Sequence, residues 1–113
     1  MFARIARFEG GSPHVIEAET ERLRREIEEI RSGRGTDSAT ARLGALADRV
    51  VMLTDRSGGK AATIIFCRTE EQLREVDRIM QGMSPQAGEG HRSSYDLYEV
   101  ALDEALSDTA KAA

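Results

Sequence analysis

Two neighbouring strand-like stretches constrain the fold of this chain more than any other feature. In each of them, apolar side chains would point to both faces of the strand. Residues 49–55, RVVMLTD, and residues 60–67, KAATIIFC, are rich in β-branched and apolar residues, as strands are. The four residues between them, RSGG, end in glycines that can adopt the positive φ of a tight hairpin turn. The sequence therefore predicts an antiparallel pair of strands with an apolar surface on each side.

A strand and a helix precede this hairpin. Residues 1–9, MFARIARFE, alternate with apolar groups on both faces, which indicates an interior strand. Ser12 then offers an N-cap hydroxyl, and Pro13 presets the backbone angle of a first helical residue. We expect a helix from this point to about residues 32–33, followed by a loop over residues 33–47 with at most a short helical turn around residues 39–46.

A second helix and a last strand follow the hairpin. Thr69 and Gln72 have the spacing of a capping box, so this helix begins directly after the strand that ends at Cys67. It is expected to end at Gly82. Residues 93–102, SSYDLYEVAL, have the composition of a fourth strand.

The expected order is β-α-β-β-α-β, the ferredoxin-like plan of α+β proteins, with a four-stranded antiparallel sheet and two helices on one face. Residues 1–103 form this single domain, and residues 104–113 are a polar, Ala-rich C-terminal tail. Two helices on one face leave the other apolar face bare. We therefore expect a homodimer in which the open sheet face packs on a second copy.

Composition excludes several classes of function. The net charge of −4 and the pI near 5.2 argue against a nucleic-acid partner, because such proteins usually carry a basic stripe. No run approaches the ~20 apolar residues of a membrane span, so no membrane partner is expected. The lone cysteine, Cys67, excludes an intrachain disulfide and suits a reducing cytoplasm.

Three stretches resemble the dimeric α/β-barrel proteins grouped with antibiotic biosynthesis monooxygenases. MFARIARFEGGSP is similar to that family's first strand and helix start, ATIIFCRTEEQLREV to its third strand and second helix, and SYDLYEVAL to its closing strand. The resemblance covers well over half of the chain. It implies a homodimer with two facing sheets, and a pocket in each subunit between sheet and helices.

The resemblance also bears on cofactors. Members of the haem-degrading branch carry an Asn on the first strand, a Trp where the third strand meets the second helix, and a His ligand on that helix. This chain has no Asn and no Trp, Cys67 stands at the Trp position, and no His lies between His14 and His91. We therefore expect no haem. The chain also lacks a phosphate-cradling glycine loop and the expected ligands, so we expect neither flavin nor metal.

Three polar residues are candidates for catalysis. Arg4 could bind a substrate carboxylate or enolate, or form an ion pair at a surface or interface. His14, just inside the first helix, could accept a proton at a pocket mouth or be an exposed helix-start residue. His91 lies among glycines before the last strand and could act from a lid or sit in a solvated loop.

The apolar candidates would form an adaptable pocket for a flat organic ligand, or they are plain core. Cys67 could be a reactive thiol at the positive end of a helix, or a small buried hydrophobe. The expected ligand-binding set is Phe8, Met52, Phe66, Cys67, Met80 and Met83.

Two hypotheses for function follow. The first, implied by the resemblance, is cofactor-independent oxidation of a small aromatic or polyketide-like substrate. The second is a non-catalytic homodimer that binds a small ligand or has a structural role. An enclosed cavity with at least two converging polar groups would favour the first, and a filled core would favour the second.

Overall fold

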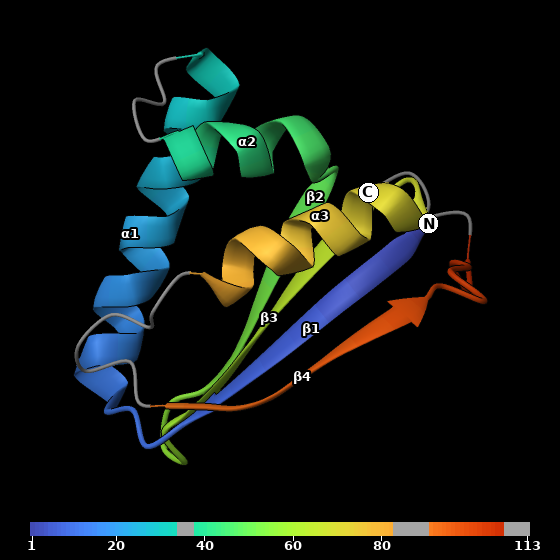
Figure 1. Cartoon of the computed structure of the whole chain (residues 1–113). Helices are drawn as coiled ribbons and strands as arrows, with labels where there is room; N and C mark the ends of the chain where they lie inside the picture. Colours follow the sequence, from blue (N-terminus) through green and yellow to red (C-terminus); the bar gives the residue numbers. More distant parts are fainter. Residues whose placement is uncertain (34–37, 83–90, 108–113) are drawn as a thin grey trace.

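The computed structural model of the chain describes residues 1–33, 38–82 and 91–107, and its fold belongs to the α+β class (Figure 1). The strands are β1 (Phe2–Glu9), β2 (Arg49–Asp55), β3 (Lys60–Cys67) and β4 (His91–Glu99). The helices are α1 (Pro13–Ser32), α2 (Ser38–Leu46) and α3 (Glu70–Gln81). None of the described helices has the length and apolarity needed to cross a bilayer.

The four strands form one open antiparallel sheet in the order β2-β3-β1-β4. The first strand is interior, as its two apolar faces predict, and β2 and β3 form the predicted hairpin. Arg4 lies opposite Ile65 of β3 on one side and Leu97 of β4 on the other. Because side chains alternate along a strand, this register assigns each residue of the sheet to one of its two faces.

Side-chain caps set the beginnings of α1 and α3. The Ser12 hydroxyl accepts a hydrogen bond from the Val15 amide at 3.3 Å, and Pro13 follows at the first helical position. At α3, the Thr69 hydroxyl accepts from the Gln72 amide at 3.1 Å, and the Gln72 side chain accepts from the Thr69 amide at 3.2 Å. The predicted capping box is confirmed.

The expectation of two helices is wrong, because the segment read as a loop contains a nine-residue helix, α2. Leu43 and Leu46 of α2 pack against the core, and α2 lies between α1 and α3. Gly44 permits the close approach of α1: a Cβ at this position would come within 2.6 Å of the Ile30 side chain. Tertiary packing thus stabilises a helix of nine residues, which is too short to be stable alone in water.

The last strand is also shifted from its expected position. β4 begins at His91, which pairs with Glu9, so His91 belongs to the strand and not to the preceding loop. The strand ends at Glu99, and residues 100–102 lie beyond it. Val100 donates one further backbone hydrogen bond, to the Met1 carbonyl at 2.9 Å.

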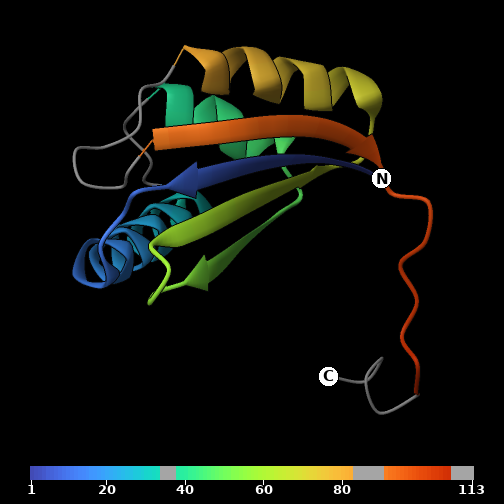
Figure 2. The same ribbon diagram turned by 90° about the horizontal axis from the view of Figure 1, so that it is seen from below.

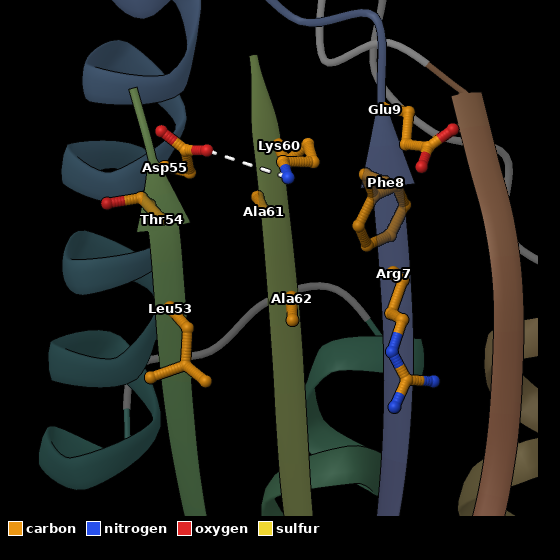
Figure 3. A pocket seen from close by; sticks show the side chains of 9 residues that line it. All are labelled: Arg7, Phe8, Glu9, Leu53, Thr54, Asp55, Lys60, Ala61 and Ala62. Carbon is orange, nitrogen blue, oxygen red and sulfur yellow. Dashed lines mark ion pairs between the residues drawn. The ribbon is translucent and has the colours of Figure 1, made fainter. Parts of the chain in front are cut away.

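The core lies between the sheet and the helices. Ile65, Cys67, Leu73 and Val76 form its buried centre. Partly buried apolar side chains surround them: Phe2, Leu43, Leu46, Ala47, Val50, Met80 and Leu97. The three helices lie on this side of the sheet, with α3 across β1 and β3 and with α1 behind β2 (Figures 1 and 3).

The opposite side of the sheet carries apolar side chains that no described helix covers. We call this side the open face. Alternation from Arg4, which points to α3, assigns to it Ile5, Val51, Leu53, Ile64, Phe66 and Tyr98, with Ala3 and Ala62 between them. Leu53 and Tyr98 are 53% and 48% exposed. The open face is therefore an exposed apolar patch of the kind that marks an association surface.

Gly59→Ala tests the contact between the hairpin turn and the chain that leads into α1. Gly59 has φ +67°, its carbonyl accepts from the Gly11 amide at 3.1 Å, and an added Cβ would lie 2.3 Å from the Gly11 oxygen. We expect Gly59→Ala to lower the free energy of unfolding by about 1–3 kcal/mol in urea denaturation. Gly82→Ala is the matched control, because Gly82 has φ −79° and its nearest contact would be an ordinary 3.5 Å. Equal stabilities of the two variants would contradict this interpretation.

Candidate functional site

Arg4 is the most unusual of the candidate residues, because an arginine side chain is rarely buried completely. Its side chain lies in the middle of the sheet, on the side that the helices cover, and is only 1% exposed. Nε donates to Oδ1 of Asp77 on α3 at 3.0 Å. The guanidinium carbon lies 5.2 Å from the centre of the Tyr95 ring on β4, within range of a cation–π contact.

One end of the Arg4 guanidinium has no partner among the described residues. Its Nη2 atom is buried and has no hydrogen-bond partner among the described residues. A guanidinium has five N–H donors, and a buried donor left unpaired costs about 1–3 kcal/mol, or more when it is charged. Such a group in a native protein calls for a specific explanation.

Arg4, Asp77 and Tyr95 form what we call the Arg4 cluster. Asp77 is 21% exposed and Tyr95 is 43% exposed, so exposure falls from the outside of the cluster to Arg4 at its inner end. Tyr95 belongs to the edge strand β4, and Asp77 to α3. The cluster thus presents, from its solvent side inward, an aromatic ring, a carboxylate and a buried cation.

The other two catalytic candidates lie away from Arg4. His14 is an exposed residue in the first turn of α1. His91 pairs through its backbone with Glu9, five residues along β1 from Arg4, a separation of about 17 Å in a strand. The side chain of His91 lies outside the described part of the structure. Of the three candidates, Arg4 alone belongs to the cluster.

The apolar candidates are divided between the two faces of the sheet. Cys67 is fully buried in the core and Met80 packs beside it, whereas Phe66 lies on the open face with Arg49 at 6.0 Å above its ring. Met52 lies against α1, where its sulfur accepts from the Thr20 hydroxyl at 3.6 Å. Met83 lies outside the described residues. The described members of the set therefore do not surround a single pocket.

Phe8 lines a shallow depression near the hairpin end of the sheet (Figure 3). The depression has a volume of about 290 Å³ and is bordered by Arg7, Leu53, Asp55, Lys60 and Ala62, among others. A second depression, of about 200 Å³, lies between the start of α3 and the end of β4, and is lined by Phe2, Leu73 and Tyr98, among others. Arg4 lines neither of them.

The sequence analysis did not identify Asp77 and Tyr95 as partners of Arg4. A signal for Asp77 existed, because it follows Val76 on the buried stripe of α3, where an acidic residue needs a cation. No comparable signal marks Tyr95, since its place beside Arg4 depends on the pairing of β1 with β4.

The surroundings of Cys67 favour an unreactive thiol. Its side chain has no exposed surface, and burial raises the pKa of the thiol, with a further contribution from the Asp48 carboxylate. A raised pKa keeps the thiol protonated at neutral pH, and the thiolate is the form that reacts. The position at the start of a helix, which suggested reactivity, is outweighed by desolvation.

Comparison with known protein families, with curated proteins and with solved structures gives no match for this chain. In the described part of the structure, no three His, Cys, Asp or Glu side chains converge as metal ligands would. The Arg4 cluster is therefore the candidate site on which the following proposals rest.

Cys67→Ser tests the place of this residue in the core. We expect the serine variant to lose about 1–3 kcal/mol of unfolding free energy, because its hydroxyl would be buried among apolar neighbours without a partner. Cys67→Ala, which removes the sulfur without adding a polar group, should lose less. In the native wild-type protein, iodoacetamide at neutral pH should label Cys67 only as fast as the protein unfolds. Rapid labelling would show an accessible thiol and contradict the assignment.

Proposed function

We propose that this chain functions as a homodimer of the dimeric α/β-barrel type that binds a small aromatic carboxylate at the Arg4 cluster, without catalysing a reaction. The ferredoxin-like plan is part of this proposal. It is supported by the strand order β2-β3-β1-β4 and by the crossovers through α1 and α3. We further propose a cytoplasmic location, which agrees with a single, buried, free cysteine.

The unpaired Nη2 of Arg4 carries the ligand proposal. A carboxylate or enolate oxygen would accept a charge-assisted hydrogen bond from the buried Nη2. Asp77 already occupies Nε and fixes the orientation of the guanidinium. The ligand would thus accept a hydrogen bond from Nη2, which Asp77 helps to orient and which donates to none of the described residues.

The aromatic part of the proposal rests on Tyr95. Its ring lies over Arg4 and is 43% exposed, so it forms the outer wall of the cluster on the edge strand. A flat ligand could stack on this ring while its carboxylate reaches inward. Since Arg4 lines neither depression, binding requires the Tyr95 side chain to move aside. This opening should make binding weak and selective.

Oxidation without a cofactor has less support than binding. That chemistry needs a base beside the substrate to remove a proton. Among the described side chains, the carboxylate nearest to Arg4 is Asp77, which is engaged by the guanidinium, and His14 is exposed at the start of α1. We therefore propose a binding protein.

The homodimer is supported by the composition of the open face. Half-buried Ile5, Val51, Ile64 and Phe66 form its centre, and charged residues lie around them. Arg7 pairs with Asp96 at 3.0 Å on the rim, with both side chains roughly half exposed. An apolar centre with a polar rim is the usual anatomy of a protein–protein interface.

A panel of aromatic carboxylates tests the ligand proposal. Benzoate, salicylate and naphthoate should raise the melting temperature of the protein, whereas the corresponding neutral amides should not, because an amide cannot form the charged pair. Arg4→Lys should weaken binding measured by calorimetry by about tenfold or more, since lysine lacks the planar fork. Arg7→Lys, on the same strand but on the open face, is the matched control and should bind normally. A folded dimer that responds to none of these carboxylates would refute the ligand proposal.

Ile64→Lys tests the homodimer. This residue lies at the centre of the open face, on an interior strand, and a charge there should be costly to bury against a second copy. We expect Ile64→Lys to elute as a monomer in size-exclusion chromatography with light scattering while keeping its far-UV circular dichroism. Ala18→Lys, at an exposed position of α1, should leave the oligomeric state unchanged. Dimers of equal stability in both variants would place the interface elsewhere.

A further inference from the structure

The segment that follows β4 extends away from the rest of the domain. Val100 donates to the Met1 carbonyl at 2.9 Å, beside the end of β4, and residues 101–107 continue without helix or strand. Figure 2 shows that this segment runs away from the sheet on the side opposite α3, which is the side of the open face. We call residues 101–107 the arm.

The arm carries two large apolar side chains that the described residues do not cover. Leu102 is 79% exposed and Leu106 is fully exposed. Burying a leucine side chain gains about 1.5–3 kcal/mol relative to leaving it in water. Two uncovered leucines four residues apart are thus a substantial driving force for docking on an apolar surface, and the open face is such a surface on the same side of the sheet.

The size of the open face indicates that a stable dimer needs more contact than the two sheets provide. Four strands of about eight residues cover roughly 19 by 27 Å, so two facing sheets bury about 1,000 Å² in total. Stable interfaces bury about 1,200–2,000 Å². An extended arm about 23 Å long and one strand wide, contributed by each copy and laid beside the sheet-to-sheet contact along the edge of the partner's sheet, would bring the total to about 1,400 Å².

Charge on the arm also matches the open face. Asp103 and Glu104 lie between the two leucines, and both are exposed. Arg49 lies at the edge of the open face over Phe66, and none of the described residues forms an ion pair with it. An acidic arm laid along a second copy could reach this cation, and two-fold symmetry would make the contact twice.

We propose that residues 101–107 form an arm that packs along the β2 edge of the open face of a second copy of this chain, beside the contact between the two sheets, with Leu102 and Leu106 as its apolar anchors. The inference rests on the homodimer proposed above and adds to it an exchanged segment. The arm of each copy then contacts the other copy, in addition to the contact between the two sheets. The arm, about as long as a strand of the sheet, has the reach to lie along the partner's open face.

Replacement of the anchors tests the contribution of the arm. We expect the double variant Leu102→Ser/Leu106→Ser to raise the dimer dissociation constant at least tenfold in sedimentation equilibrium. The conservative double variant Leu102→Met/Leu106→Met, which keeps apolar side chains, should dimerise as the wild type does. Equal dissociation constants for the serine variant and the wild type, with both dimeric, would overturn the arm and leave the homodimer standing. A wild-type chain that is monomeric would overturn both.

A paramagnetic label distinguishes exchange from folding back on the same chain. A nitroxide is attached at Glu104→Cys in a Cys67→Ala background, and this chain is mixed with ¹⁵N-labelled, cysteine-free chain. In the mixed dimers, amide signals of the open-face strands on the ¹⁵N copy, such as those of β2 and β3, should broaden. If these signals broaden only when label and ¹⁵N are on one chain, the arm folds on its own sheet and the proposal is wrong.

Discussion

Apolar side chains occupy both faces of the sheet, and helices cover only one of them. The helical side is filled by Ile65, Cys67, Leu73 and Val76, so its stability is supplied within the chain. On the open face, Leu53 and Tyr98 remain about half exposed. Because a chain of 113 residues has a small core, a second apolar surface left in water is a cost that association removes.

The same division of the sheet explains the two arginines of β1. Arg4 and Arg7 are three residues apart and therefore lie on opposite faces. Arg7 forms an exposed ion pair with Asp96 on the open face, a contact of small energetic value. Arg4 is desolvated beneath α3, and among the described residues its ion pair with Asp77 leaves Nη2 without a partner. Burial thus makes one arginine a candidate anchor for a ligand and leaves the other as an exposed residue on the rim of the open face.

Local signals in the sequence predicted most of the fold. Ser12, Pro13 and the Thr69 capping box set the helix starts, and alternation with a glycine turn set the hairpin. Only a short helical turn was predicted where the nine-residue helix α2 lies, because the packing of Leu43 and Leu46 on distant residues stabilises the longer element. The site was predicted only in part. Arg4 was named as a possible binder of a carboxylate or enolate, but its partners come from α3 and β4, and sequence patterns do not specify such contacts.

The covering of the open face by a second copy is the central claim, and the mass of the native particle tests it most directly. Sedimentation equilibrium of the unmodified 113-residue chain at micromolar concentration should give twice the chain mass of 12.4 kDa. A particle of 12.4 kDa that still unfolds in one cooperative transition would contradict the account, because the open face would then be stable in water.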